Sequence, residues 1–214
     1  MDLAIFPLQL IVFPGEQLNL HIFEPRYRNL FNDLKKDDHL TFGIPPMVNH
    51  QIYGVGTQLK LVQIVKEFPN GEMDVITEGI SVFSINSILN PYLDKIYAGA
   101  DVDILEADPT YNIIKFEVLR GFYDDFQALL PQKKEIKDVQ PEIYSFQIAH
   151  FSGLNEQQKL ALLGNPSEEE RQELMIEHFE KIIPSMRSID ETQKRILANG
   201  HFKNLKSFNF SELK

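Results

Sequence analysis

The chain has 214 residues, with 21 Lys and Arg against 31 Asp and Glu, so its formal net charge is −10. Because each phosphate contact normally needs a Lys, an Arg or a backbone N–H, this balance disfavours a general nucleic-acid-binding protein. The sequence has no Cys, which excludes a disulfide framework, Cys-ligated zinc, an iron–sulfur cluster and a thiol nucleophile.

The N-terminal segment MDLAIFPLQL has no basic residue before its apolar stretch, and Pro7 and Gln9 interrupt that stretch. It therefore lacks the pattern of a signal peptide. No window approaches the roughly 20 uninterrupted apolar residues that a membrane helix needs. We expect a soluble, cytoplasmic protein with no membrane partner.

The first predicted strand covers residues 18–22. Leu18, Leu20 and Ile22 alternate with Asn19 and His21, so the apolar and polar side chains point to opposite faces. This pattern is typical of a half-buried strand.

Residues 58–66 are rich in β-branched and aliphatic side chains and predict a second strand. The alternation slips between Leu61 and Val62, as either a bulge or burial of both faces would produce. Asn70 and Gly71 follow and can supply the two positive-φ positions of a tight hairpin turn.

The partner strand of this hairpin is predicted at residues 73–77, and a separate strand at 82–88 ends at the turn signal of residues 90–91. Asp101 and Asp103 then alternate with apolar residues. We interpret this pattern as the solvent face of an edge strand rather than as a cation site.

One helix is predicted inside this β-rich region, at residues 25–35, with Pro25 in its first turn. Its apolar stripe recurs every three or four residues and consists of Tyr27, Leu30, Phe31 and Leu34.

Beyond residue 108 the periodicity becomes helical. A helix that stops before Pro131 carries the stripe Leu119, Phe122, Phe126 and Leu129. Ser167 and Glu170 have the spacing of a capping box at the start of another helix, whose stripe is Met175, Phe179, Ile182 and Met186. Pro184 is expected to kink or split this helix, and a last helix is predicted from about residue 188 to a cap at 199–200.

These elements predict a β domain at residues 1–106, a helical domain at 107–200 and a basic C-terminal tail at 201–214. Residues 1–107 hold 7 basic and 14 acidic side chains, a net charge of −7, whereas residues 108–214 hold 14 and 17, a net charge of −3. The acidic excess is therefore concentrated in the β domain.

The sequence contains no recognisable catalytic or metal-binding motif. It lacks a P-loop, a G-x-S-x-G turn and an H-E-x-x-H pair, and its only G-x-G leads into a strand. His21 near Glu24, and His178 between Glu177 and Glu180, are better interpreted as surface or half-buried histidines than as metal ligands. We therefore predict no enzyme activity, no metal and no cofactor.

Residues 6–27 read FPLQLIVFPGEQLNLHIFEPRY and resemble the start of the Lon protease N-terminal (substrate-binding) domain. That family has a Pro-Leu strand, a V-F-P-G turn and an I-F-E-x-R-Y segment that leads into its first helix. Further similarities follow in order and extend over about residues 3–190: Gly56-Thr57, Pro69-Asn70-Gly71, Glu78-Gly79, Phe83-Ser84-Ile85, Tyr92, and residues 158–163 and 169–174. One departure is Val82, where the family often has Arg.

The resemblance implies an α+β fold, with a PUA-like β pseudo-barrel that contains one early helix, followed by a helical bundle. It also implies a stand-alone module without the ATPase and protease domains of full Lon. In the family, this domain is expected to engage unfolded or tagged proteins. The family-motif residues are interpreted as structural: Pro14, Gly15, Glu24, Arg26, Tyr27, Gly79 and Phe83.

The loop at residues 44–53 is the candidate peptide-binding segment. Met47, Val48, Ile52 and Tyr53 give it an adaptable Met, a rigid Tyr and two aliphatic side chains, which suit promiscuous peptide contacts. A loop partly packed against the rest of the protein remains an equal alternative.

The resulting hypothesis is a non-catalytic protein- or peptide-binding module. Its expected partners are unfolded or hydrophobic polypeptide segments, with a protease or chaperone as a further candidate. Two alternatives stay open: an RNA-associated PUA-like protein, which the charge of residues 1–107 disfavours, and a peptidase with an unrecognised site.

Overall fold

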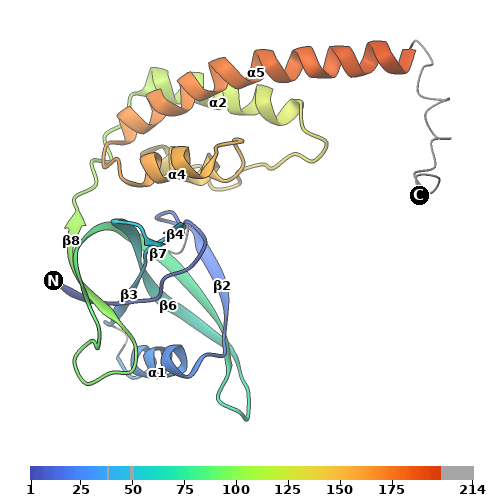
Figure 1. Ribbon diagram of the computed structural model, residues 1–214. Helices are drawn as coiled ribbons and strands as arrows, with labels where there is room; N and C mark the ends of the chain where they lie inside the picture. The colour runs from blue at the N-terminus through green and yellow to red at the C-terminus, as the bar shows by residue number, and fades with distance from the viewer. Residues whose placement is uncertain (38, 49–50, 199–214) are drawn as a thin grey trace, which may run out of the picture.

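The computed structural model describes residues 1–37, 39–48 and 51–198 (Figure 1). Strands and one helix form one half of the molecule, and four α-helices form the other half, with β8 leading from the first half into the second (Figure 1). We term residues 1–106 the β lobe and residues 107–198 the helical lobe. The predicted α+β architecture with a helical C-terminal part is confirmed.

Six strands form the main sheet of the β lobe. Their bounds are β1 Asp2–Ile5, β2 Gln17–Ile22, β3 Thr41–Ile44, β6 Val55–Glu67, β7 Met73–Leu89 and β8 Gly99–Leu105. The pairings run from β7 through β6, β3, β1 and β8 and return to β7, so five of the strands form a closed ring. β2 pairs with the first part of β7, and β4 Met47–Val48 pairs with β5 Gln51–Ile52 in a separate short hairpin.

This closure corrects the prediction of an edge strand around Asp101 and Asp103. β8 pairs with β1 on one side and with β7 on the other, and therefore has no free edge. Asp101 and Asp103 do lie on its more exposed face, where both carboxylates accept hydrogen bonds from Asn86. The alternation identified the exposed face correctly, but strand pairing is a tertiary property that it could not show.

The two strands predicted at 73–77 and 82–88 are one continuous strand, β7. The prediction of a break was wrong because its first part pairs with β2 and its second part with β8, while β6 pairs along both parts. The slip in β6 is confirmed as a bulge, because the register shifts between Leu61 and Gln63.

The hairpin turn between β6 and β7 differs from the prediction in one respect. Gly71 has a φ of +82°, but Asn70 is not among the residues with positive φ. The Phe68 N–H donates to the Glu72 carbonyl and the Gly71 N–H donates to the Phe68 carbonyl. The loop is thus longer than a two-residue turn and needs only one left-handed residue, which Gly provides.

Helix α1, Pro25–Leu34, buries the predicted stripe of Tyr27, Leu30, Phe31 and Leu34 against the inside of the sheet. Phe31 meets Phe42 of β3 at a centroid separation of 5.2 Å. The helix therefore fills one end of the ring of strands and contributes its four stripe residues to the β-lobe core.

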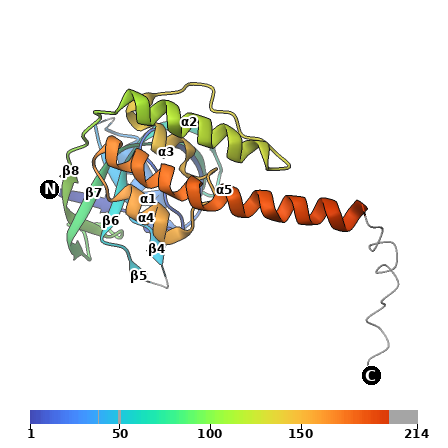
Figure 2. The same ribbon diagram turned by 90° about the horizontal axis from the view of Figure 1, so that it is seen from above.

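The helical lobe consists of α2 Ile113–Ala128, a short 3₁₀ turn at Pro141–Ile143, α3 Tyr144–Ala149, α4 Glu156–Leu163 and α5 Glu168–Ala198. α2 and α5 lie side by side in both views (Figures 1 and 2). No helix in the described ranges is long and apolar enough to cross a membrane.

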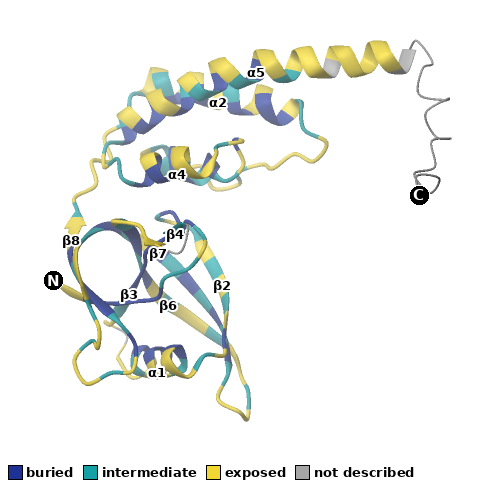
Figure 3. Ribbon diagram, viewed as in Figure 1, coloured by how far each residue is buried: buried dark blue, intermediate teal, exposed yellow. Residues whose placement is uncertain are grey.

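Of the two effects expected at Pro184, a kink or a split, the split is wrong, and with it the separate last helix from about residue 188, because α5 runs without a break from Glu168 to Ala198. Ile183, the residue before the proline, is buried at 4% exposure, and Arg187 beyond it pairs with Asp125 of α2 at 2.7 Å. One side of the proline is therefore held in the core of the helical lobe and the other side is held on α2. The outer part of α5 extends past α2 and is largely exposed (Figures 2 and 3). The predicted tail at 201–214 and the cap at 199–200 lie outside the described residues.

The capping box predicted at the start of α5 is only half formed. The Glu170 N–H donates to Ser167 Oγ at 3.4 Å, but the Ser167 N–H donates to Asn165 instead of to Glu170. The Glu170 carboxylate accepts from the Asn165 side chain. Asn165 therefore accepts from the Ser167 N–H and donates to the Glu170 carboxylate, the two groups that a complete capping box would join to each other.

The turn at residues 13–16 joins the two lobes. It crosses β7 at Gly79, where the Gly15 N–H donates to the Gly79 carbonyl and the Gly79 N–H donates to the Glu16 carbonyl, both at 2.9 Å. The Phe13 side chain enters the helical core and stacks on Phe146 of α3 at 5.3 Å. Because its neighbours in this core come from the helices, the two lobes share one apolar cluster.

A buried ion pair lies at the start of α5. The side chains of Glu168 and Arg171 are 0% and 2% exposed, and their nearest atoms, Oε2 and Nη2, are 2.7 Å apart. Ser145 of α3 donates its N–H and its hydroxyl to Glu168, and Arg171 Nη1 donates to the Asn165 carbonyl. The guanidinium also lies 3.9 Å from the centroid of the Phe146 ring. Burial lowers the pKa of Arg171, although Glu168 opposes this shift.

We predict that Gly79→Ala destabilises the protein by about 1–3 kcal/mol, because an added Cβ would lie 2.5 Å from the Phe13 carbonyl oxygen. Gly54→Ala is the matched control, since a Cβ at that glycine meets nothing within 4 Å, and it should change stability by less than about 0.5 kcal/mol. Urea unfolding measures both free energies, and equal effects of the two substitutions would contradict the close approach at Gly79.

We also predict that Arg171→Met lowers the free energy of unfolding by about 3–5 kcal/mol, because it leaves the Glu168 carboxylate buried without its cation. Arg187→Met breaks an exposed pair with Asp125 and should cost less than about 1 kcal/mol. The two variants are compared by urea unfolding, and a small loss for Arg171→Met would show that the buried pair is dispensable.

Candidate functional site

Two clefts lie between the lobes, and both are lined by Pro14 and Phe146. Pro14 stands at the tip of the turn that crosses β7, and Phe146 is the α3 residue on which Phe13 stacks. The same contact that joins the lobes thus forms a common wall of both clefts.

The first, which we term the apolar cleft, has a volume of about 290 Å³. Its lining includes Ile80, Val82 and Ile104 from β7 and β8, and Ile143, Phe146 and Leu163 from the helical lobe. Ile80 is 41% exposed and Ile104 is 36% exposed. Large aliphatic side chains are therefore presented to solvent in a concave site, as is typical of a binding surface.

Charged groups also line the apolar cleft. Glu106 and Glu142 come from different lobes and are exposed, and neither has an ion-pair partner among the described residues. Arg171 is the cation that lines the cleft, but its guanidinium is buried and bonded to Glu168. The accessible charge around this cleft is therefore negative, because it comes from the two unpaired carboxylates.

The second, which we term the mixed cleft, has a volume of about 550 Å³ and carries charges of both signs. Lys134 and Lys137 line it together with Glu16, and His150 lies in its wall. His150 Nε2 is 3.2 Å from Glu16 Oε2, and Nδ1 is 3.3 Å from the Nζ of Lys159. Because an ammonium group can only donate, Nδ1 accepts from Lys159 and the Nε2–H donates to Glu16.

A third concave surface, of about 570 Å³, lies between α4 and α5 and includes His178. Its Nε2 is 2.8 Å from the Ser152 carbonyl, to which it donates, and Nδ1 accepts from Gln158. His178 is therefore a half-buried structural histidine, as expected. Within the ranges that the structure describes, no group of three or more acidic or histidine side chains is arranged to hold a metal ion.

The four residues predicted to bind peptide lie on the β4–β5 hairpin, and none of them lines either interlobe cleft. Val48 packs against the helical core, and Met47 is half-buried. Ile52 and Tyr53 are 37% and 41% exposed. Of the four predicted residues, Met47 and Val48 are therefore partly packed against the protein, and Ile52 and Tyr53 are exposed to solvent.

Two groups of family-motif residues make structural contacts. Arg26 bonds to Glu24 at 2.9 Å and lies 4.5 Å from the centroid of the Tyr27 ring, which is itself 3.8 Å from that of Phe6. Burial raises the pKa of Tyr27. Phe83 is fully buried, with its ring where a Cβ on Gly43 or Gly56 would have to lie. Of the seven motif residues, Pro14 and Gly15 line an interlobe cleft.

No sequence pattern predicted Ile80, Ile104, Glu106 or Glu142 as site residues. Ile80 falls between the two strands predicted within β7, and Ile104 occupies an inward position of the alternating pattern. Both become exposed where β7 and β8 reach the helical lobe. No local pattern could have shown this, because the concave surface arises only when the two lobes meet.

Comparison with known proteins places this architecture in a family. Residues 2–181 match the family described as the ATP-dependent protease La (LON) substrate-binding domain. The Lon protease 1 of Hydrogenovibrio crunogenus is 24% identical over 134 residues, which are 59% of this chain but only 16% of that protein.

Two solved structures share the fold. The Lon N-terminal domain protein from Xanthomonas campestris aligns with a TM-score of 0.65 at 19% identity, covering 82% of this chain and 97% of that one. The N-terminal domain of Lon protease from Mycobacterium avium complex aligns with a TM-score of 0.62 at 14% identity, covering 85% and 99%. Since the family match extends over most of its length, the chain belongs to the LON substrate-binding domain family.

Proposed function

We propose that this protein is a non-catalytic module that binds extended polypeptide segments by inserting their apolar side chains into the apolar cleft. The observation that carries the proposal is the exposure of Ile80 and Ile104 in a concave site formed by both lobes. Membership of a substrate-binding domain family supports it. The matched relative is named a protease, so a protease or chaperone that acts on the bound segment is the expected further partner.

The size of the cleft supports a polypeptide ligand. A volume of about 290 Å³ is at the lower limit of small-molecule pockets and suits one or two large side chains. Burying one such side chain contributes about 1.5–3 kcal/mol, from which the cost of ordering the peptide is subtracted. The expected affinity is therefore weak, as a module that samples many segments requires.

The charge distribution favours polypeptide over RNA. Residues 1–107 carry a net charge of −7, and the apolar cleft adds two unpaired carboxylates to its rim. An RNA backbone would be repelled by both.

The test uses a fluorescein-labelled peptide of twelve residues with a Phe-Leu-Phe centre and Ser on both sides. We expect Ile80→Ser combined with Ile104→Ser to weaken its binding about tenfold in fluorescence anisotropy, because the exposed apolar wall is lost. The peptide should be recovered intact after incubation, and an Ala-centred peptide should not bind.

The comparison variant is Ile52→Ser combined with Tyr53→Ser, which removes the exposed part of the hairpin predicted from sequence. It should bind the peptide as the unmodified protein does. If this variant loses binding and the cleft variant retains it, the contact surface is the hairpin and the cleft assignment is wrong. Circular dichroism melts establish that both variants are folded.

A further inference from the structure

We propose that the apolar cleft selects segments in which the apolar side chains are flanked by Lys or Arg. This inference rests on the function proposed above and adds a charge preference to it. It derives from the two unpaired carboxylates that line the cleft and from the absence of an available cation beside them in the described chain.

Glu106 and Glu142 approach the cleft from different lobes. Glu106 follows the end of β8, and Glu142 lies in the 3₁₀ turn before α3. Both are exposed, and neither makes a hydrogen bond or an ion pair within the described residues. A chain that crosses the cleft from one lobe to the other would therefore pass a carboxylate on each side.

The nearby cationic side chains already form ion pairs with other residues of the protein. Arg171 is bonded to Glu168, Ser145 and the Asn165 carbonyl, so its charge is neutralised inside the protein. Lys115, near the start of α5, bridges Glu169 and Glu173. A basic ligand would therefore meet little repulsion at the apolar cleft.

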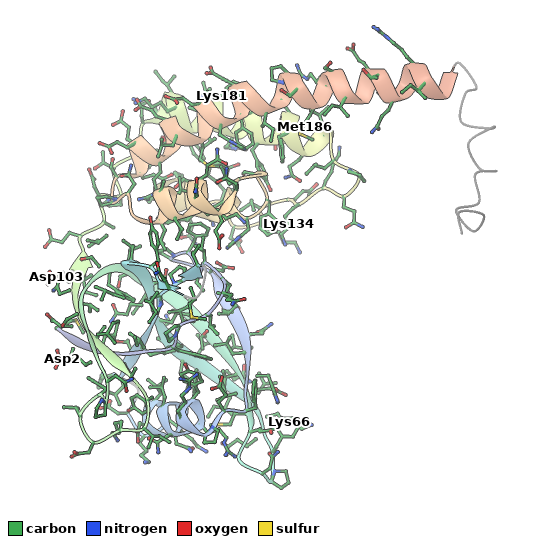
Figure 4. All side chains as sticks on the ribbon, viewed as in Figure 1. Asp2, Lys66, Asp103, Lys134, Lys181 and Met186 are labelled. Atoms are coloured by element: carbon green, nitrogen blue, oxygen red, sulfur yellow. The ribbon has the colours of Figure 1, made fainter. Side chains whose placement is uncertain are left out.

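Two further carboxylates lie near the connection between the lobes, although neither of them lines the apolar cleft. Asp103 projects from β8 close to the passage into the helical lobe (Figure 4), and Asp108 follows in the connecting segment. Asp103 contacts the Asn86 amide but forms no ion pair within the described residues, and the hydrogen bonds from Thr110 lower the pKa of Asp108. Together with Glu106 and Glu142, these two side chains bring the carboxylates around the junction of the lobes to four.

The mixed cleft differs from the apolar cleft in the charges that line it. It is lined by Lys134 and Lys137 as well as by Glu135 and Asp138, so its charges offset one another. A preference for basic flanks is therefore expected at the apolar cleft and not at the mixed cleft.

The experiment compares three labelled peptides that share the Phe-Leu-Phe centre and differ in flanks of Lys, Ser or Glu. We expect the Lys-flanked peptide to bind about 2- to 10-fold more tightly than the Ser-flanked one, because each exposed ion pair contributes modestly. The Glu-flanked peptide should bind more weakly than both. At about 0.5 M salt the three affinities should converge, because the added ions screen exposed charges.

The charge variant is Glu106→Gln combined with Glu142→Gln. It should abolish the advantage of Lys flanks, so that the Lys-flanked and Ser-flanked peptides bind this variant with equal affinity. The matched control is Glu135→Gln combined with Glu180→Gln, which changes the net charge equally at exposed positions outside the apolar cleft. This control should keep at least half of the Lys advantage.

The outcomes separate the two proposals. If none of the three peptides binds, the proposed function fails. If all three bind equally, or if the control pair removes the Lys advantage as completely as the cleft pair does, the polypeptide-binding function stands and the charge preference is wrong.

Discussion

The insertion of Phe13 into the helical core is the contact on which the arrangement of the two lobes depends. Its backbone belongs to the turn that crosses β7 at Gly79, while its ring stacks on Phe146 of α3. A side chain at position 79 would collide with the Phe13 carbonyl, so the turn can lie this close only over a glycine. Backbone proximity on one side and aromatic packing on the other therefore hold the lobes together.

The buried Glu168 and Arg171 pair stabilises the same junction from the helical side. Its partners come from α3 and from the segment before α5, so it connects the start of α5 to the helix that receives Phe13. A charge pair in this position is costly to break, because either partner alone would be buried without compensation. Its placement also keeps the one arginine beside the apolar cleft from contributing a free positive charge.

The junction also creates the proposed binding surface. Two lobes that meet through a narrow contact leave concave space beside that contact, and the strand ends that reach it expose Ile80 and Ile104. Carboxylates from both lobes border this space. This apolar, acidic-rimmed cleft is the site we propose for a segment of unfolded chain, and the chain's membership of a substrate-binding domain family supports that proposal.

Local patterns in the sequence determined the helix at Pro25–Leu34, the exposed face of β8 and the family, because each depends on neighbouring residues or on an ordered motif. They indicated an irregularity in β6 but left open whether it was a bulge or burial of both faces, which the strand pairing decided. Only the tertiary structure decided that β7 is one strand, that α5 continues through Pro184 and that β8 has no free edge, since partners distant in sequence impose these features. The sequence indicated a polypeptide-binding module but directed attention to the β4–β5 hairpin. The apolar cleft emerged only from the fold, because its walls come from lobes that meet through Phe13.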